Sequence, residues 1–203
     1  MPIFCLKIGA PKQLLDREER IMSQSQETKF KLIIEGCYQR NRASQHALYK
    51  LYYAYAMSIC IRYVNNESEA ISIVNDGFLK VFKYIKKYDK EKPFKPWFRR
   101  ILVNTAITYI KRQKKFKMEV ELNEANEMAS QEDILSRIGY KELIGMVQSL
   151  SIAYRMVFNM YVIDGFKHKE IAAELGITVA TSKSNLTRAR AKLKELVTKE
   201  INS

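Results

Sequence analysis

A short stretch near the carboxyl end of the chain combines a sharp turn with polar side chains at helical spacing. Gly176 permits the left-handed backbone that such a turn needs, and Thr178 can cap a helix that starts after it. Hydroxyls and Lys can bind phosphates, and an Arg can bridge two acceptors on a guanine edge. The side chains that this helix leaves outward have these chemistries: Lys183, Ser184, Thr187, Arg188 and Arg190.

The residues before the turn predict a partner helix. Ile171 and Leu175 lie on one face of a short helix that begins at Lys169, and the small Ala172 lets two helices approach closely. Together the two segments form a helix-turn-helix pattern, whose second helix enters the major groove of DNA. An ordinary pair of helices with a solvated basic face is the alternative. We favour DNA binding because the outward side chains are short and directly follow a capped turn.

A second stretch, from Phe94 to Lys117, interleaves aromatic side chains with cations. Aromatic rings can stack on unpaired bases while Lys and Arg hold the backbone. Like charges at the density of its basic tail cost stability unless a polyanion neutralises them. The alternative for Trp97 is a place in the core, because a lone Trp that opens an amphipathic helix is usually buried.

A third candidate is the tract from residue 70 to residue 82. Asn75 and Asp76 alternate there with apolar side chains that include Phe82, so a partly apolar ridge could bind a partner helix. Periodicity alone favours plain core for the same tract.

The charge balance indicates what kind of partner to expect. The chain has 203 residues and carries 35 Lys and Arg against 22 Asp and Glu, a formal net charge of +13. Such a surplus suggests nucleic acid or an anionic membrane face. The most apolar stretch, residues 51–61, is too short to cross a bilayer, and Lys7 interrupts the apolar start before a signal peptide could form. We therefore expect a cytoplasmic protein with no membrane insertion.

Catalytic and metal sites have little support. Cys5, Cys37 and Cys60 form no C-x-x-C pair, and the only two histidines are His46 and His168. This argues against a disulfide framework and a zinc site. Paired carboxylates and Gly-rich phosphate loops are also missing from the pattern. We expect a binding protein, with no catalytic residue, no metal and no cofactor.

Four helices are predicted in the first half of the chain from the spacing of apolar residues. The first covers about 28–39. The second is capped by Ser44 and carries Leu51 in its apolar stripe, and the third is capped by Ser68. The fourth runs over about 97–115, after a loop that contains prolines.

The second half again shows four helices, separated from the first by an acidic tract. Residues 117–133 lose the apolar periodicity, which predicts a solvated linker. Residues 134–203 form the second helical group, in which Gly165 ends the second helix. Residues 1–27 are aperiodic and are predicted to be a disordered extension. The expected fold is all-α: two small helical domains, 28–116 and 134–203, joined by a flexible linker.

Three of these segments, in this order, resemble the extracytoplasmic-function (ECF) sigma factors, the minimal members of the main bacterial RNA polymerase sigma family. Residues 48–52 and 73–82, the latter reading IVNDGFLKVF, look like region 2 of that family. Residues 97–104, reading WFRRILVN, are similar to its promoter-melting helix. Residues 170–193 look like its region 4, a helix-turn-helix.

The resemblance implies a sigma factor that directs RNA polymerase core to specific promoters and assists DNA melting, without catalysis of its own. The implied partners are the polymerase core, through the coiled coil of its largest subunit, double- and single-stranded promoter DNA, and commonly a membrane-anchored anti-sigma factor. The positions implied to bind the polymerase core are Asn75, Asp76 and Phe82. The positions implied to bind DNA are Trp97, Arg99, Arg100, Asn104, Arg112, Thr181, Lys183, Ser184, Asn185, Thr187, Arg188 and Arg190.

The chain departs from the family pattern at several positions. Ile71-Ser72 stands where an acidic pair is usual, and Ser182 and Asn185 stand where Val and Arg are common. Gly77-Phe78, taken with residues 181–184, looks most like members from Bacteroides-type bacteria. The alternative functions are an autonomous helix-turn-helix regulator that never binds polymerase and, less favoured, a basic nuclease. Binding to core polymerase would distinguish the first from a sigma factor.

Overall fold

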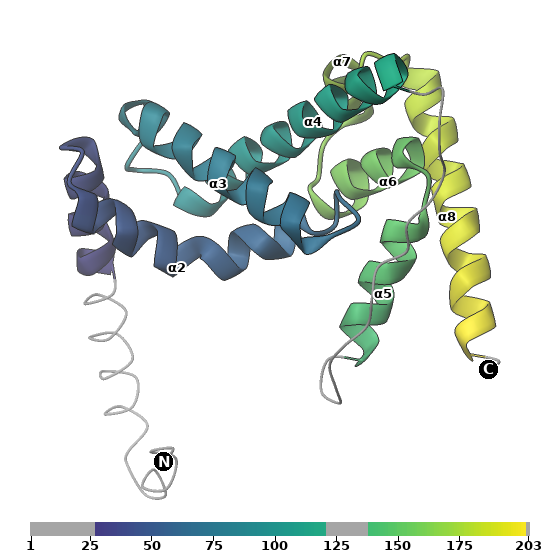
Figure 1. The fold of residues 1–203 in the computed structure, drawn as a ribbon, viewed down its shortest axis with the longest axis horizontal. Helices are drawn as coiled ribbons and strands as arrows, with labels where there is room; N and C mark the ends of the chain where they lie inside the picture. Colours follow the sequence, from purple (N-terminus) through teal and green to yellow (C-terminus); the bar gives the residue numbers. More distant parts are fainter. Residues whose placement is uncertain (1–26, 121–137, 202–203) are drawn as a thin grey trace, which may run out of the picture.

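The computed structural model describes residues 27–120 and 138–201, and every regular element within these two ranges is helical (Figure 1). The first range holds a helix over residues 27–38, α2 (Arg42–Cys60), α3 (Glu67–Tyr84), a 3-10 turn, η1 (Ile85–Lys87), and α4 (Phe94–Val120). The second holds α5 (Ile138–Ser149), α6 (Ile152–Phe158), a π-helical turn, η2 (Asn159–Ile163), α7 (His168–Leu175) and α8 (Val179–Ile201). The predicted all-α fold is confirmed. We call residues 27–120 the first domain and residues 138–201 the second domain.

Two predicted segments fall mainly outside the described residues. These are the N-terminal extension, except for Glu27, and the linker, except for residues 117–120. Those four residues continue α4, which therefore runs past the domain end expected at residue 116.

The helices α2 and α3 each begin at an asparagine. Oδ1 of Asn41 accepts a hydrogen bond from the backbone N–H of Ser44 at 3.1 Å, and Oδ1 of Asn66 accepts one from Glu69 at 2.8 Å. The prediction of Ser44 and Ser68 as caps is wrong, since both serines lie inside the first turn. The reason is that Asn is as good an N-cap as Ser, so each helix starts at the asparagine that comes first.

Aromatic rings join α2, α3 and α4 into one core. Phe98 has no exposed surface, and its ring centroid lies 5.0 Å from that of Phe78 and 5.5 Å from that of Phe94. Trp97 is half-buried, with its ring 5.2 Å from Tyr88. Tilted rings at these separations add attraction beyond the apolar area that they bury. Trp97 thus packs against the core and keeps part of its surface exposed.

A glycine sets the distance between α3 and α4. Gly77 is buried, and a Cβ placed on it would lie only 2.6 Å from Cδ2 of Leu102, which is itself fully buried. A side chain at this position of α3 would therefore force Leu102 to shift within the core.

Two glycines end helices of the second domain. Gly165 has φ +75° and Gly176 has φ +69°, the left-handed conformation that favours glycine. The backbone N–H of Phe166 bonds to the carbonyl of Met160 at 2.8 Å, and that of Ile177 bonds to Ala172 at 3.1 Å. The predicted turn at Gly176 is confirmed. Gly165 ends the second helical segment as expected, although that segment finishes in the π-helical turn η2.

The two domains pack against each other (Figure 1). One continuous cluster of buried apolar side chains runs from Ile34 in the first domain to Leu186 in the second. Two amides of the second domain also donate to the carboxyl end of α2. Nε2 of Gln148 bonds to the carbonyls of Ile61 at 2.9 Å and Val64 at 3.0 Å. Nδ2 of Asn159 bonds to the carbonyl of Arg62 at 2.7 Å. Because a helix end leaves carbonyls without helical partners, the second domain caps α2.

We expect Gly77→Ala to lower the free energy of unfolding by about 1–3 kcal/mol, because the added methyl group overpacks the contact with Leu102. Gly145→Ala is the matched control, since a Cβ at this position in α5 meets nothing within 4 Å. That control should leave stability unchanged or raise it by up to about 1 kcal/mol through helix propensity. Urea denaturation followed by circular dichroism measures both. Equal stability of the Gly77 variant and the wild type would contradict the close contact between α3 and α4.

Candidate nucleic-acid interface

The polar side chains predicted to face outward on α8 are exposed in the structure. Oγ1 of Thr178 accepts a hydrogen bond from the backbone N–H of Thr181 at 3.0 Å, which caps the helix. Asn185 is half-buried. The other predicted DNA-binding side chains of α8 are exposed: Thr181, Lys183, Ser184, Thr187, Arg188 and Arg190. They lie within the first half of α8, the part of a helix-turn-helix that reaches base edges.

A polar contact that the sequence did not reveal fixes α8 against α7. Oγ of Ser182 is fully buried and lies 2.9 Å from Nδ1 of His168, the first residue of α7. The His168 ring stacks on Tyr161, with centroids 4.3 Å apart, and the guanidinium of Arg190 lies 6.0 Å from the same Tyr161 ring. The Ser182 hydroxyl thus forms a hydrogen bond between the two helices. Arg190 is therefore held partly by Tyr161.

The predicted DNA-binding residues of α4 are in more varied environments. Arg112 and Arg100 are exposed, whereas Trp97 and Asn104 are half-buried. Oδ1 of Asn104 is buried and has no hydrogen-bond partner among the described residues. The Arg99 side chain is only 33% exposed, because it points into the junction with the second domain.

The partner of Arg99 is a buried carboxylate. Nε of Arg99 lies 2.6 Å from Oδ1 of Asp164, and one terminal nitrogen donates to the carbonyl of Ile163 at 2.5 Å. Arg62 reaches the same Asp164 oxygen at 3.5 Å, and the Tyr63 hydroxyl donates to Oδ2. The Asp164 side chain has no exposed surface. We call these four residues, Arg62, Tyr63, Arg99 and Asp164, the Asp164 cluster.

The Asp164 cluster surrounds its carboxylate with opposite charges and hydrogen-bond donors. A buried carboxylate is stable only when opposite charges and hydrogen-bond donors surround it, and here three side chains supply them. Burial first, and then the neighbouring Asp164 carboxylate, hold the pKa of the Tyr63 phenol well above its usual value of 10. Tyr63 therefore stays protonated and donates at neutral pH.

Two more cations of α4 meet the second domain. The Arg100 guanidinium lies 3.7 Å from a carboxylate oxygen of Glu170, and Nζ of Lys111 donates to the carbonyl of Glu174 at 2.5 Å. Both acceptors are on α7, which lies beside the carboxyl half of α4 in Figure 1. The structure thus brings α4 against α7, the first helix of the helix-turn-helix. Two predicted DNA-binding residues of α4, Arg99 and Arg100, contact the loop before α7 and α7 itself, and the predicted residues of α4 do not join those of α8 in one site.

The predicted polymerase-binding residues lie on α3. Asp76 is exposed, and the exposed Asn75 accepts a hydrogen bond from the Tyr49 hydroxyl at 3.0 Å. Phe82 is half-buried, 6.0 Å from the buried ring of Phe78. Asn75 and Asp76 are therefore exposed on α3, where a partner could contact them, whereas Phe82 mainly packs against the core.

Two leucines of α2 and α3 are exposed, and one of them, Leu79, lies at i+4 from Asn75 and at i+3 from Asp76 on α3. Leu79 on α3 is 66% exposed, and Leu51 on α2 is 57% exposed. The prediction that Leu51 belongs to the buried face of its helix is wrong. Its neighbours Leu48 and Tyr52 turn inward instead, and a helix buries only one stripe.

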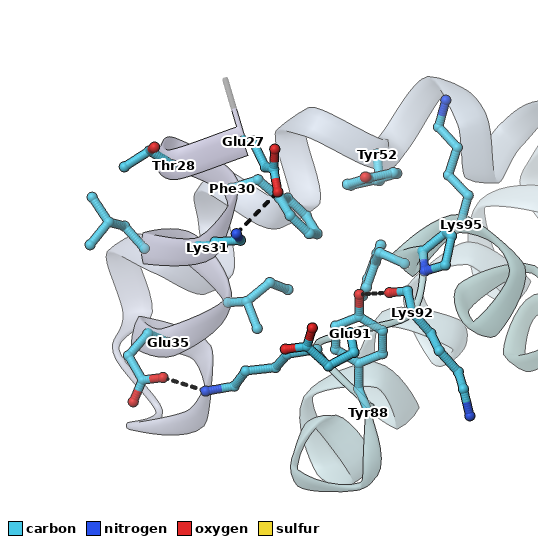
Figure 2. Close-up of a pocket in the computed structure, with 15 residues that line it drawn as sticks. Glu27, Thr28, Phe30, Lys31, Glu35, Tyr52, Tyr88, Glu91, Lys92 and Lys95 are labelled. Carbon is cyan, nitrogen blue, oxygen red and sulfur yellow. Dashed lines mark hydrogen bonds and ion pairs between the residues drawn. The ribbon is translucent and has the colours of Figure 1, made fainter. Parts of the chain in front are cut away.

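A cavity of about 850 Å³ opens between the helix over residues 27–38 and the loop before α4 (Figure 2). Phe30, Tyr52, Tyr88 and Phe94 form its apolar wall. Its lysines are partly engaged: Lys31 pairs with Glu27 at 3.0 Å, and Lys90 pairs with Glu35 at 2.6 Å. The predicted DNA-binding and polymerase-binding residues do not line it.

Metal and membrane features are limited in the parts of the chain that the structure describes. Residues 27–120 and 138–201 contain no group of three His, Cys, Asp or Glu side chains that could hold a metal ion. Within the same ranges no helix is long and apolar enough to cross a membrane. Burial raises the pKa of Cys37 to about 11 and that of Cys60 to about 12, so both thiols stay protonated.

The environment of His168 predicts a loss of stability in acid. Burial, followed by the charges of Lys183 and Arg190, lowers the pKa of His168 below its ordinary value of 6.5. The unfolded chain therefore binds a proton at a pH where the folded chain does not, and stability falls as the pH drops below about 6.5. We expect His168→Gln to reduce the loss of urea resistance between about pH 7.5 and about pH 5.5. His46→Gln, at an exposed histidine of α2, should leave the loss unchanged. Identical pH profiles of wild type and the His168 variant would rule out this role.

Comparison with known proteins shows which family this chain is similar to. The sigma-70 region 2 family matches residues 48–116, and the sigma-70 region 4 family matches residues 140–193. The ECF RNA polymerase sigma factor SigE of Mycolicibacterium smegmatis is 25% identical over 162 residues, which are 76% of this chain and 60% of that protein. The RNA polymerase sigma factor SigV of Bacillus subtilis is 28% identical over 145 residues, 70% of this chain and 84% of that protein. The match thus spans less than two thirds of SigE but most of SigV.

A solved structure shares the fold. The sigma factor RpoE, in complex with the anti-sigma factor NepR from Bartonella quintana, superimposes with a TM-score of 0.50 at 21% identity. The superposition covers 75% of this chain and 96% of that one. Two regions of one family, matched in order over α2–α4 and α5–α8, show that the chain belongs to the sigma-70 family of RNA polymerase sigma factors, and its similarity to relatives named ECF sigma factors supports the ECF group within that family.

Proposed function

We propose that this chain is a sigma factor that directs RNA polymerase core to specific promoters and assists DNA melting at the start of transcription. The observation that carries this function is the exposed polar face of α8 behind a capped turn, within the region 4 match. The chain acts by binding: α8 reads the upstream promoter element as duplex, and α4 handles the downstream element as it opens. Transcription by core polymerase, with and without the chain, on fragments of the host genome tests this directly. Initiation at discrete sites should depend on the chain.

The exposed face of α3 supports RNA polymerase core as a partner of this chain. Asn75 and Asp76, with the exposed Leu79 beside them, form a polar and apolar face on α3 that suits the coiled coil of the polymerase largest subunit. This face favours a sigma factor over an autonomous helix-turn-helix regulator, which would not need it. An anti-sigma factor is a further proposed partner, since the RpoE structure holds the anti-sigma factor NepR. Gly77-Phe78 and residues 181–184 support the narrower resemblance to Bacteroides-type members.

We expect Asp76→Lys, combined with Asn75→Ala, to weaken binding to core polymerase by at least tenfold, about 1.4 kcal/mol. Both side chains are exposed, so helical content and melting temperature should stay near the wild-type values. Glu142→Lys, at an exposed acid of α5, makes the same change of charge away from α3 and should bind normally. Pull-down with purified core polymerase measures binding, and circular dichroism follows the fold. If the double variant unfolds, these residues belong to the fold and not to a docking surface.

We expect Arg188→Ala to reduce affinity for the preferred upstream element by about 1–3 kcal/mol, because its guanidinium can donate two hydrogen bonds to one base edge. Much less should be lost on a duplex changed at that base. Lys183 is nearer the start of α8 and is assigned to phosphate, so Lys183→Ala should weaken all duplexes alike and lower the salt slope by about one. Titrations of both duplexes at several salt concentrations separate the two roles. An equal loss on both duplexes for Arg188→Ala would reduce this residue to a phosphate contact.

A further inference from the structure

A hydrogen bond from α2 reaches the face of α3 that is proposed to bind the polymerase core. The Tyr49 hydroxyl of α2 donates to Oδ1 of Asn75 on α3 at 3.0 Å. The two helices pack against each other (Figure 1), so this bond ties an exposed side chain of one helix to the other. The terminal torsion of an asparagine is broad, so an exposed Asn amide has no fixed orientation unless a neighbour holds it.

The ring that carries this hydroxyl is itself held by the core. The centroid of the Tyr49 ring lies 4.6 Å from that of Phe78, which is buried, and 5.3 Å from that of Tyr53. Phe78 follows Asn75 by three residues, so the two are neighbours on the surface of α3. The Tyr49 ring therefore packs on Phe78 and extends its hydroxyl to Asn75, at the exposed edge of the contact.

The Tyr49 hydroxyl is a donor at neutral pH. Partial burial first, and then the neighbouring Tyr53 phenol, raise the pKa of Tyr49 above its usual value of 10. The phenol therefore stays protonated, and Oδ1 of Asn75 accepts its hydrogen.

This bond determines which end of the Asn75 amide faces a partner. The amide carries an oxygen that accepts hydrogen bonds and an NH2 group that donates two, on opposite sides of one flat group. Because Tyr49 engages the oxygen, the NH2 group lies on the side away from Tyr49. Within residues 27–120 and 138–201 this NH2 group has no hydrogen-bond acceptor. A pair of exposed donors is thus held in one orientation on α3, and an ordered side chain loses less conformational entropy when a partner binds.

We propose that Tyr49 is a positioning residue for this face of α3, and that it holds the Asn75 amide with its NH2 group outward to donate to an oxygen acceptor of the polymerase core. The proposal rests on the proposed function for the identity of the partner. Tyr49 acts through Asn75 and needs no contact with the polymerase itself.

The test is a double-mutant cycle in the full-length chain. Tyr49→Phe removes the hydroxyl and keeps the ring against Phe78, and it is made alone and together with Asn75→Ala. Tyr53→Phe is the matched control, because it removes a hydroxyl from the neighbouring ring, which has no hydrogen bond to α3 among the described residues. Asn75→Asp keeps an oxygen that can accept from Tyr49 and lacks the NH2 group. Competition with fluorescently labelled wild-type chain for purified core polymerase gives the affinities, and urea denaturation followed by circular dichroism gives the stabilities.

We expect Tyr49→Phe to weaken binding to core polymerase by about threefold to tenfold, the usual effect of losing one hydrogen bond. Tyr53→Phe should bind within about twofold of wild type, as surface changes away from a contact usually do. In the Asn75→Ala background, Tyr49→Phe should cost less than about twofold more, because the side chain that it positions is already gone. Asn75→Asp should lose at least as much affinity as Asn75→Ala, since neither offers the outward donors.

Additive losses in the double variant would show that Tyr49 acts independently of Asn75 and would overturn the proposal. Wild-type affinity of Asn75→Asp would overturn the outward NH2 group. The same cycle in stability measures the bond in the free chain: coupling between the two substitutions supports it, and independent effects contradict it. Failure of the wild type itself to bind core polymerase would contradict the proposed function, while the stability cycle still decides whether Tyr49 holds Asn75.

Discussion

One buried carboxylate determines how the two halves of this molecule meet. Asp164 follows directly after the π-helical turn of the second domain, and its oxygens accept from three side chains of the first domain, Arg62, Tyr63 and Arg99. A carboxylate without solvent exposure costs far more than an exposed one unless cations and donors surround it. Arg62 and Arg99 provide the charge, and Tyr63 provides a neutral donor. These three come from the end of α2 and from the start of α4, so one side chain fixes both helices relative to the helix-turn-helix.

The local chemistry of each DNA surface could be predicted because it depends on near neighbours. Gly176 and Thr178 specify a turn and a cap within three residues, and the outward face of α8 follows from a period of 3.6. The caps of α2 and α3 were misassigned for an equally local reason, since two acceptable residues compete within one turn and the first one starts the helix. Leu51 shows the limit of periodicity: the apolar stripe that contains Leu48, Leu51 and Tyr52 is wider than the face that α2 buries.

The contacts between the domains could not be predicted because nothing in a sequence pairs residues that far apart. Arg99 and Asp164 are 65 positions apart, and Tyr63 and Asp164 are 101 apart. Asp164-Gly165 is a common turn signal, and turn chemistry accounts for both residues without any partner. Ser182 was noticeable only as a departure from the family pattern. The departure has a structural counterpart in His168, which supplies the buried hydroxyl with a hydrogen-bond partner.

The contact between the domains consists of two kinds of bond that respond differently to the solution. The Arg100–Glu170 pair is exposed, and dissolved ions weaken it over a distance of about 8 Å at physiological ionic strength. The amide–carbonyl bonds at the end of α2 carry no net charge, and the Asp164 carboxylate is shielded from mobile ions by the protein around it. Changes in cellular salt therefore act on the outer part of the contact and leave its centre largely unaffected.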